Sequence, residues 1–405
     1  MSAAPKTTGA GPLRRLKVID AGAMIAGPLA ATQLADFGAE VIKLELPEIG
    51  DSMRHWTPMK DHRSLWWKVI GRNKKLVTLN LSLPEGREIF RKFVATADIV
   101  FENFRPGTFE RWGLGYDALA KINPRLVLVR VSGFGQTGPY ASHGGYGTIA
   151  ECFSGIPSFT GFPDKPPTLL GFPLADSVAA TFATMSALMA IYERDQGGSG
   201  IGQVIDVSLY EPLFRLVESQ VIGFDQLGIV KQRIGNRLAE DSPRNTYETC
   251  DGNWVGISAS SQSTFERLAQ AVGMPELITD ARFRDNASRC TYGDELDAIL
   301  VAWFKTKTLT EVMALVDKGN VVAGPVLDIC GIFQDPHYRA RQNIVEVPDD
   351  DFGTVRMQSV VPHFSRTPGC VTKSGGGLGK DNDEVYERLG IGADERARLR
   401  SLKVI

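Results

Sequence analysis

The sequence predicts an α/β protein with a parallel, doubly wound sheet and a second, smaller α+β domain. Over the first half of the chain, short apolar segments alternate with segments whose apolar residues recur at helical spacing. This alternation is typical of βαβ units and a parallel sheet. From about residue 225 the pattern changes to a strand pair followed by helices. The 405 residues also exceed the roughly 250 to 300 that one core usually supports, so two domains are expected.

The first domain begins with one βαβ unit, and strands and helices then continue to alternate. Short runs of β-branched and apolar residues predict the strands, and apolar residues three or four positions apart predict the helices. The expected strands are residues 16–20, 41–44, 76–81, 98–101, 126–131 and 203–207. The expected helices are residues 27–37, 84–97, 115–122 and 177–193, the last ended by the glycines at 197, 198 and 200.

The second domain is predicted to be a small α+β domain. Its strands are residues 245–249 and 254–258, joined by the turn Asp251-Gly252, and its helices are residues 262–272, 293–304 and 309–317. Two β-like runs, a Gly-rich loop at 375–379 and short terminal helices then return to the first domain. We therefore assign 14–224 together with 330–405 to the large domain, 225–329 to the small domain, and 1–13 to a disordered tail.

The composition describes an ordinary globular protein. The net charge of −2, with 43% hydrophobic and 23% charged residues, gives no long-range attraction to nucleic acid or to an anionic membrane. Residues 1–13 lack the apolar core of a secretory signal, and residues 174–192 contain Asp176 with serines and threonines, which favours a buried helix over a membrane span. We expect a cytoplasmic protein.

The cysteines and histidines do not indicate a metal site. The five cysteines are scattered without a Cys-x-x-Cys pair, which predicts reduced thiols. The five histidines, at 55, 62, 143, 337 and 363, have no ligand spacing. We therefore predict no metal.

Polar residues follow the strands predicted at 98–101 and 126–131. In an open α/β sheet, ligands bind outside the carboxyl ends of the strands. Asn103, Phe104, Arg105 and Arg111 therefore stand where an anion with an aromatic ring could be held. The other interpretation is that Asn103 to Gly107 only form a turn, since Pro and Gly favour chain reversal. Both interpretations are open at this point.

A Gly-containing turn opens the first helix. Gly22 and Gly27 lie five positions apart, which fits neither a dinucleotide fingerprint nor a P-loop. A tight strand-to-helix turn is the simpler interpretation, although a helix N-terminus offers free N–H groups to an anion.

Asp176 lies at the start of the most apolar helix. Its ordinary role is that of an N-cap, and its functional alternative is a carboxylate nucleophile; the two do not exclude each other.

Seven blocks of the sequence occur in this order in the class III coenzyme A transferases, which the chain resembles over nearly its whole length. They are residues 16–20 with Ala26-Gly27-Pro28, residues 34–45, Gly50-Asp51 with Arg54, residues 72–75, 103–107, 132–136 and 174–177. The resemblance implies a Rossmann-like large domain made from both chain ends and a smaller inserted domain. It also implies an interlocked homodimer in which each ring-shaped subunit is threaded through its partner.

The resemblance places the family's nucleophilic aspartate on Asp176. This carboxylate would form first a mixed anhydride and then an aspartyl thioester with coenzyme A (CoA), which is a substrate and not a permanently bound cofactor. The residues that would contact CoA are Met24, Ile25 and Ala26 beside the thioester, and Arg72, Lys74, Lys75, Asn103, Phe104, Arg105 and Arg111. Lys74, Lys75 and Arg111 would bind phosphates and Phe104 the adenine.

Departures from the family pattern narrow the function. Ile25 stands where the oxalate-handling branch has glutamine, so oxalate is not the expected substrate. Lys380 stands where the family usually has glutamate, so no role is assigned to that glutamate. The α-methylacyl-CoA racemase branch needs a histidine where this chain has Tyr146, and an ordinary tyrosine has a pKa of about 10, which suits proton abstraction poorly. A non-catalytic CoA-binding subunit is a third alternative.

We expect succinyl-CoA as the donor and malate, mesaconate, citramalate or itaconate as the acceptor, closest to the succinyl-CoA:malate branch. Arg233, Arg237 and Arg244 could meet a second carboxylate, although solvated surface arginines are the other interpretation. A betaine or an aromatic acid is also open. The partners are the acyl-CoA and a small carboxylic acid, in a homodimer or in a hetero-oligomer with a related subunit.

Overall fold

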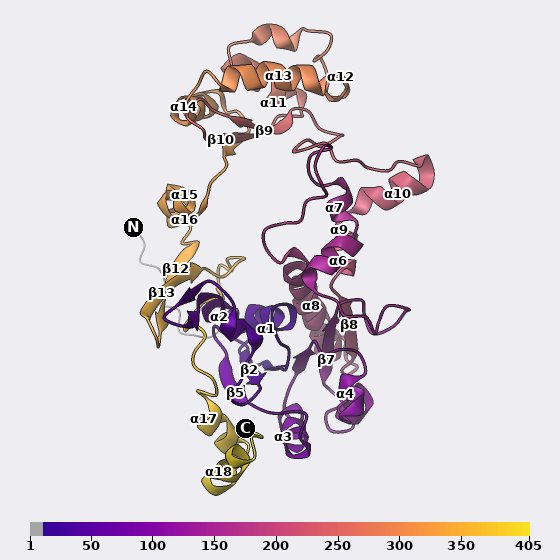
Figure 1. Cartoon of the computed structure of the whole chain (residues 1–405), viewed down its shortest axis with the longest axis vertical. Helices are drawn as coiled ribbons and strands as arrows, with labels where there is room; N and C mark the ends of the chain where they lie inside the picture. The colour runs from indigo at the N-terminus through magenta and orange to yellow at the C-terminus, as the bar shows by residue number, and fades with distance from the viewer. Residues whose placement is uncertain (1–10) are drawn as a thin grey trace. The chain divides into compact units, whose positions relative to one another are not determined.

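The protein is described by a computed structural model over residues 11–405 (Figure 1). The chain divides into two compact units. Among the described residues, the large unit comprises residues 11–156, Leu170–Val221 and Tyr338–Ile405, and the small unit comprises Pro157–Leu169 and Ile222–His337. Each unit is built from its own core, so the two-domain organisation expected from the length is present.

The domain boundaries differ from those predicted. The small unit includes Pro157–Leu169 and extends to His337, whereas the prediction gave 225–329. The reason is a local pairing, since Gly161 forms an antiparallel bridge with Gly235, and the Arg233 guanidinium donates to the carbonyl of Ser158 at 3.2 Å. Residues 1–10 of the predicted tail lie outside the described residues. Residues 11–13 are not a disordered tail, because the Leu13 N–H donates to the Phe37 carbonyl at 3.0 Å.

Within residues 11–405, the large unit contains a six-stranded parallel sheet in the order β5-β2-β1-β6-β7-β8. Its strands are β1 (Lys17–Asp20), β2 (Glu40–Glu45), β5 (Lys75–Thr78), β6 (Ile99–Glu102), β7 (Val127–Ser132) and β8 (Val204–Ser208). Each of the six predicted strands overlaps one of these. The doubly wound parallel sheet predicted from the alternating pattern is therefore confirmed.

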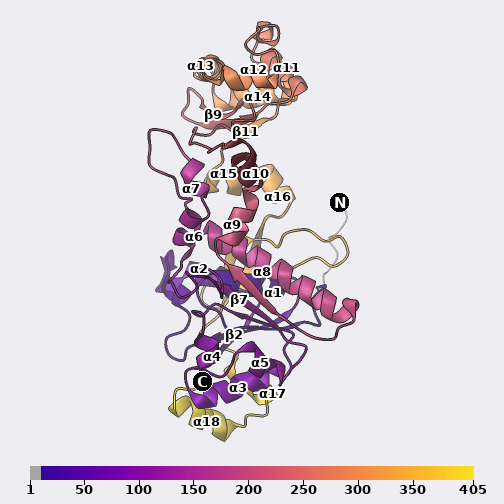
Figure 2. The same ribbon diagram turned by 90° about the vertical axis from the view of Figure 1, so that its right-hand side faces the viewer.

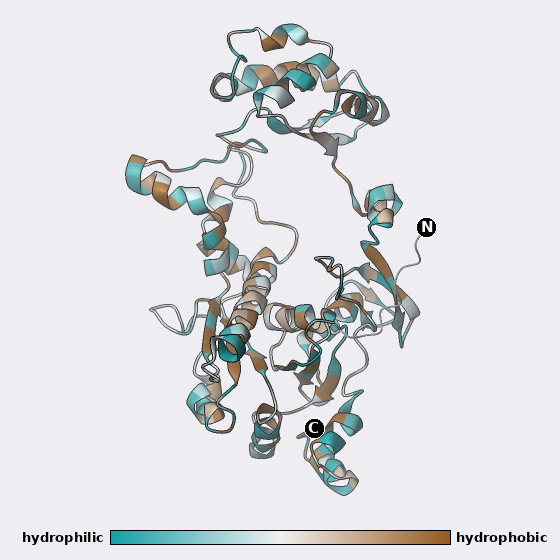
Figure 3. Ribbon diagram, turned by 180° about the vertical axis from the view of Figure 1, so that it is seen from behind, coloured by the Kyte–Doolittle hydropathy of each residue, from teal (hydrophilic) through white to brown (hydrophobic). Residues whose placement is uncertain are grey.

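Helices cover both faces of this sheet, because successive strand residues point to opposite sides. Val18 and Val129 enter the core formed with α1 (Ala26–Asp36) and α8 (Leu174–Tyr192). Ile19 and Leu128 enter the second core, formed with α3 (Pro84–Val94), α5 (Tyr116–Ala120), α17 (Asn382–Arg388) and α18 (Ala393–Ser401). Figure 2 shows the two helical layers on either side of the sheet. Figure 3 shows hydrophobic colouring on its strands and mainly hydrophilic colouring on α18.

Helix α8 is a core helix of the large unit. Among residues 11–405, its segment Leu174–Gly197 is the one helix that is long and apolar enough to cross a membrane by length and composition. Its alanines, including Ala179, Ala183 and Ala187, are fully buried, and Thr184 Oγ1 donates to the Ala30 carbonyl of α1 at 3.1 Å. One face of the predicted buried helix is therefore packed in the core, whereas Met185, Met189 and Tyr192 on α8 are exposed.

The C-terminal segment completes the large unit, as predicted. The hairpin of β12 (Ile344–Asp349) and β13 (Gly353–Gln358) precedes it. The Leu76 N–H then donates to Asp381 at 2.7 Å, and the Tyr386 hydroxyl donates to the Thr78 carbonyl.

The small unit is the predicted α+β domain. Its antiparallel sheet has the order β11-β10-β9 and consists of β9 (Arg244–Glu248), β10 (Trp254–Ser258) and β11 (Ala323–Pro325). Its helices are α11 (Gln262–Ala271), α12 (Asn286–Thr291), α13 (Gly293–Phe304) and α14 (Leu309–Gly319), and α11, α13 and α14 form the apolar core with the strands. Tyr247 stacks on Phe304 in its core at 5.1 Å between ring centroids.

Several elements were not predicted, because helices of one or two turns and strands of two or three residues carry too little periodicity, and the ten-residue helix Glu218–Leu227 has no buried stripe. They are η1 (Ser52–His55), β3 (Met59–Lys60), β4 (Arg63–Ser64), α2 (Leu65–Ile70), α4 (Thr108–Arg111), α6 (Gly147–Phe153), α7 (Ile156–Phe159), η2 (Glu193–Gly197), α9 (Glu211–Leu216), α10 (Glu218–Leu227), η3 (Pro275–Ile278), α12, β11, α15 (Ile329–Gln334) and α16 (Pro336–Ala340).

Candidate active site

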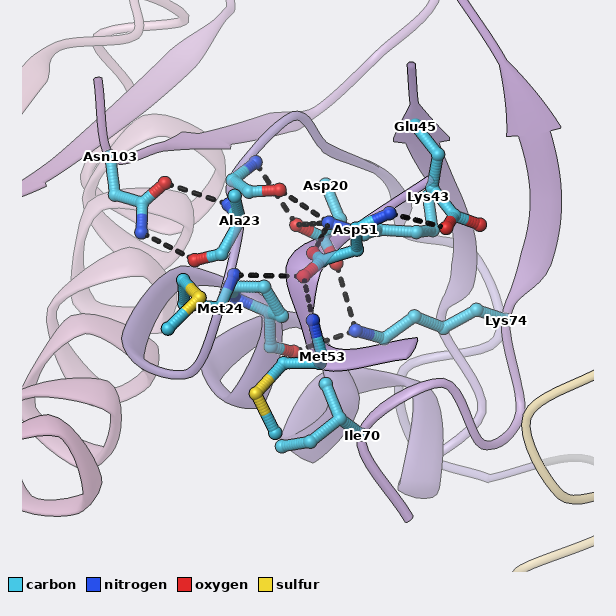
Figure 4. Close-up of polar contacts among 12 residues, drawn as sticks. Asp20, Ala23, Met24, Lys43, Glu45, Asp51, Met53, Ile70, Lys74 and Asn103 are labelled. Carbon is cyan, nitrogen blue, oxygen red and sulfur yellow. Dashed lines mark hydrogen bonds and ion pairs between the residues drawn. The ribbon is translucent and has the colours of Figure 1, made fainter. Parts of the chain in front are cut away.

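The candidate site lies at the point where the order of the strands reverses. From β1 the sheet continues to β2 and β5 on one side and to β6, β7 and β8 on the other, and ligands of open α/β sheets bind at this switch point. The loops after β1 and β6 meet there. The Asn103 amide donates to the Ala23 carbonyl at 2.7 Å and accepts from the Ala23 N–H at 2.8 Å (Figure 4). Asn103 therefore holds the loop after β1.

The loop after β1 carries the three residues predicted beside the thioester. Met24 is partly buried and has a φ of +65°, whereas Ile25 and Ala26 are buried. Ile25 packs in a small apolar cluster with Met53, Trp67 and Ile70. Helix α1 begins at Ala26, so its first N–H groups have no acceptor within the helix.

The segment after β6 presents an aromatic side chain and two exposed arginines. The partly buried Phe104 ring lies 5.1 Å from that of Trp112 and 5.5 Å from that of Phe109. Arg105 and Arg111 are exposed, and Arg111 Nη2 donates to the hydroxyl of Thr108 at 2.9 Å. The contact of these three residues with CoA stays a prediction.

Three further cations predicted at the site are paired within the protein. Arg72 is buried and binds both carboxylate oxygens of Asp36, at 3.1 and 2.6 Å. The Lys74 side chain is fully buried and donates to Asp20 at 2.8 Å. Lys75 lies at the surface and pairs with Glu384. The predicted CoA contact of Arg72 and the predicted phosphate contact of Lys74 are not supported, because both charges are already compensated inside the unit.

Asp176 is the third residue of α8 and is not its N-cap. The N-cap is Pro173, which forms no side-chain cap, so the N-cap interpretation of Asp176 is wrong by three positions. The Asp176 carboxylate instead lies against Gly147, the first residue of α6. A methyl group at Gly147 would lie 2.3 Å from Asp176 Oδ2, so only a glycine allows this approach.

The surroundings of Asp176 favour its protonated form. Burial, with a contribution from the negative charge of Glu151, raises the pKa of Asp176 to about 6, although its own backbone N–H opposes the shift. At neutral pH the group is still mainly ionised, and it is more basic than an ordinary aspartate. A partly desolvated, basic carboxylate is suited to attack an acyl carbon.

Glu151 is a residue of this site that the sequence interpretation missed. It is buried on α6, one turn after Gly147, and its Oε1 accepts from the Ala175 N–H at 3.5 Å. The signal was an acidic residue inside the apolar run Ile149-Ala150-Glu151-Cys152-Phe153.

The loop after β7 connects the switch point with Asp176. Gly133, which follows β7, approaches Gly145 so closely that a methyl group on it would lie 2.6 Å from the Gly145 Cα. A methyl group on the adjacent Gly144 would lie 3.8 Å from Arg105 Nη2. The structure therefore brings Arg105 and the loop that leads to α6 to one edge of the sheet.

The remaining sequence-predicted residues belong to the small unit or to the C-terminal segment. In the small unit, Arg237 pairs with Asp294 and with Asp297, and Arg244 Nη1 donates to the Asn236 carbonyl at 3.0 Å. Lys380 forms an ion pair with Asp350. Within residues 11–405, no group of three or more His, Cys, Asp or Glu is arranged to hold a metal ion.

The family model for CoA-transferase family III matches residues 13–382. This chain belongs to that family. The predicted enzyme class, a CoA-transferase that uses CoA thioesters as substrates, is confirmed by this match and by the named relatives.

Similar proteins match over almost the whole chain. A succinyl-CoA--D-citramalate CoA-transferase of Chloroflexus aurantiacus is 45% identical over 97% of this chain and 98% of its own length. The beta subunit of a succinyl-CoA--L-malate CoA-transferase of the same organism is 40% identical over 98% and 99%. A solved CAIB/BAIF family protein from Brucella suis has a TM-score of 0.83 at 31% identity, covering 94% of this chain and 100% of that one.

Proposed function

We propose that this enzyme transfers CoA from succinyl-CoA to a small dicarboxylate of the citramalate or malate type, with Asp176 as the nucleophile. The observation that carries the proposal is the Asp176 carboxylate, held against the Gly147 backbone at the carboxyl edge of the sheet with a pKa of about 6. The named activities of the relatives from Chloroflexus aurantiacus support the donor and the class of acceptor.

The reaction consists of four exchanges at acyl carbons. The Asp176 carboxylate attacks the thioester carbon of succinyl-CoA, the C–S bond breaks, and CoA thiolate and a mixed anhydride form. The thiolate attacks the aspartyl carbon, which releases succinate and leaves an aspartyl-CoA thioester. The acceptor carboxylate attacks this thioester to give a second anhydride and thiolate. The thiolate then attacks the acceptor's acyl carbon, which yields the new acyl-CoA and restores Asp176.

The two ends of CoA would meet different parts of the site. Arg105 and Arg111 are exposed and can form charge-assisted bonds to phosphates, and the Phe104 ring can face the adenine. The loop with Met24, Ile25 and Ala26 would lie beside the thioester, where the first N–H groups of α1 can stabilise an oxyanion. Asn103 would act through this loop.

The small unit, taken by itself, has a cavity of about 1060 Å³ that offers a cation to a small carboxylate. Its lining includes Asn236, Arg244 and Lys231, the last of which pairs with Glu240 at 2.9 Å. Arg237 is less suited to this role, because Asp294 and Asp297 already compensate its charge.

The assembly would be an interlocked homodimer or a complex with a related subunit. Helix α10 has no buried residue and exposes Val221, Ile222, Phe224 and Leu227, an apolar surface that a second chain would cover. Relatives named as alpha and beta subunits support a paired form. We expect the enzyme in the cytoplasm.

Trapping the covalent intermediate tests the proposal. Enzyme incubated with succinyl-CoA is treated with hydroxylamine, and peptide mass spectrometry locates the modified residue. We expect modification of Asp176 in the wild type. Asp176→Ala should bind CoA with unchanged affinity while transfer is lost. Full turnover by this variant would refute the proposed function.

A further inference from the structure

Four buried charged residues lie under the loop that follows β1, and we call Asp20, Lys43, Asp51 and Lys74 the buried ion cluster. Each is at most 4% exposed. Lys43 Nζ lies 2.9 Å from Asp51 and 3.8 Å from Asp20, and Lys74 Nζ lies 2.8 Å from Asp20 (Figure 4). The two positive and two negative charges balance.

The sheet places these residues together. Asp20 ends β1 and is in register with Lys43 of β2, Lys74 immediately precedes β5, and Asp51 is the N-cap of η1. Burying four charges is costly even when they are paired, and well-packed apolar residues often stabilise a core as well or better. The ion pairs alone therefore give little reason for charges at these four positions.

The polar atoms of the cluster also bind the backbone of the loop above. Lys43 Nζ donates to the Gly22 carbonyl, and the Gly22 N–H donates to Asp20 at 3.2 Å. The Met24 N–H donates to Asp51 Oδ1 at 3.1 Å. The cluster thus fixes both ends of the turn formed by residues 22–24.

The remaining groups of the loop are fixed from its two flanks. Lys74 Nζ donates to the Pro28 carbonyl in the first turn of α1 at 2.7 Å. On the other side, Asn103 holds both the N–H and the carbonyl of Ala23. Because these inward-facing groups are occupied, the loop presents its remaining donors, the first N–H groups of α1, to the site.

Met24 is the strained point of this loop. Its φ of +65° lies in the left-handed region, which residues with a Cβ adopt rarely and glycine adopts freely. Asp51 binds the N–H of this residue and also that of Met53 at 2.9 Å. Asp51 thereby ties the strained residue to η1.

We propose that Asp51 is a positioning residue for CoA transfer: it holds Met24 in the left-handed conformation that sets Ile25 and the start of α1 beside the thioester. This proposal rests on the proposed function. Asp51 acts through the loop, and its effect should therefore appear in turnover more than in the binding of free CoA, whose nucleotide end is proposed to bind at Arg105 and Arg111.

Asp51→Ala and Asp51→Asn test the proposal, with Asp36→Ala as the matched control. Asp36 belongs to the same unit, is similarly buried and is also paired with a cation, but it binds Arg72 and Asn73 and not the loop. We expect Asp51→Ala to lower kcat about tenfold with succinyl-CoA, with the dissociation constant of CoA changed by less than about threefold. Asp51→Asn keeps an acceptor oxygen and should lose less. Asp36→Ala should lower the melting temperature with kcat nearly unchanged.

A second substitution separates positioning from stability. Met24→Gly removes the conformational penalty at residue 24, so the double variant Asp51→Ala, Met24→Gly should exceed Asp51→Ala in kcat by about threefold or more. Full kcat in both Asp51 variants would overturn the proposal, as would a loss that Asp36→Ala reproduces at an equal melting temperature. Failure to modify Asp176 in the wild type would instead refute the proposed function, so the two failures are distinguishable.

Discussion

Asp51 and Asp176 are both largely buried carboxylates of the large unit, yet their surroundings shift their pKa values in opposite directions. Burial opposes ionisation of Asp51, but the charge and hydrogen bond of Lys43, with the N–H groups of Met53 and Met24, hold its pKa below the ordinary value. Burial raises the pKa of Asp176, the negative charge of Glu151 adds to this effect, and the pKa reaches about 6. Burial alone therefore does not decide whether the pKa of a carboxylate is raised. The sign of the neighbouring charge decides it in these two residues.

Neutralising each of the two carboxylates should give losses of very different size. In the proposed mechanism Asp176→Asn removes the group that becomes bonded to the acyl carbon, so kcat should fall by about a thousandfold or more. Asp51→Asn should lower kcat by at most about tenfold, because it alters a positioning residue and leaves every reacting group in place. Steady-state assays at matched folded fractions measure both. Equal losses would remove the distinction between the two residues.

Gly147→Ala should be the next most damaging change. The added methyl group would lie 2.3 Å from Asp176 Oδ2, so the carboxylate must move away from it. Misplacing a reacting group by about 1 Å lowers kcat about a hundredfold. Gly171→Ala is the matched control, since a methyl group there has no neighbour within 4 Å. Crystal structures of the variant would show the displacement directly. Unchanged kcat would mean that the approach to Gly147 is irrelevant to the chemistry.

Arg111→Ala should weaken the binding of acyl-CoA without altering the chemistry. We expect the KM for succinyl-CoA to rise about fivefold with kcat retained, because an exposed guanidinium that meets a phosphate is lost. Lys75→Ala should change KM by less than about twofold, since Lys75 pairs with Glu384 and Glu40. The effect of Arg111→Ala should shrink as salt is raised. Equal effects at both positions would restore the original assignment of Lys75.

Glu151→Gln should give the smallest change, a shift of the acidic limb of the pH profile. In the proposed mechanism transfer needs the ionised Asp176 carboxylate, so activity should rise with pH through a pKa of about 6. Removing the negative charge of Glu151 favours the ionised form, which lowers this pKa and moves the limb to lower pH. Relative to its own plateau at about pH 8, the variant should be more active than the wild type at about pH 5. An unmoved limb would exclude Glu151 as a cause of the raised pKa.

The sequence predicted most of the fold because its strong elements are periodic or clearly bounded. Strands β6 and β7 are short apolar runs, and α14 begins at a Thr308 capping box. Helix α6 was missed because seven residues with Gly147 at their start carry no clear amphipathic pattern. Small elements therefore escaped although they carry part of the site.

The candidate site was predicted less completely. Asp176 was found through the resemblance, but Lys74 and Arg72 were assigned to CoA because a sequence does not reveal which cations are already paired. Their partners, Asp20 and Asp36, lie 54 and 36 positions away. Only the folded sheet shows that these charges are buried and compensated.

The hydrogen bonds between α1 and α8 connect the loop with Met24 to the helix that carries Asp176. Thr184 and Gln33 join the two helices, one of which begins at the loop with Met24 and the other of which carries Asp176. Within one unit, the proposed nucleophile Asp176 and the loop proposed to face the thioester thus belong to two helices that are packed and hydrogen-bonded together. Their separation is set when the chain folds, so substrate recognition can proceed without first closing a gap between them, and binding energy remains available for the reacting atoms.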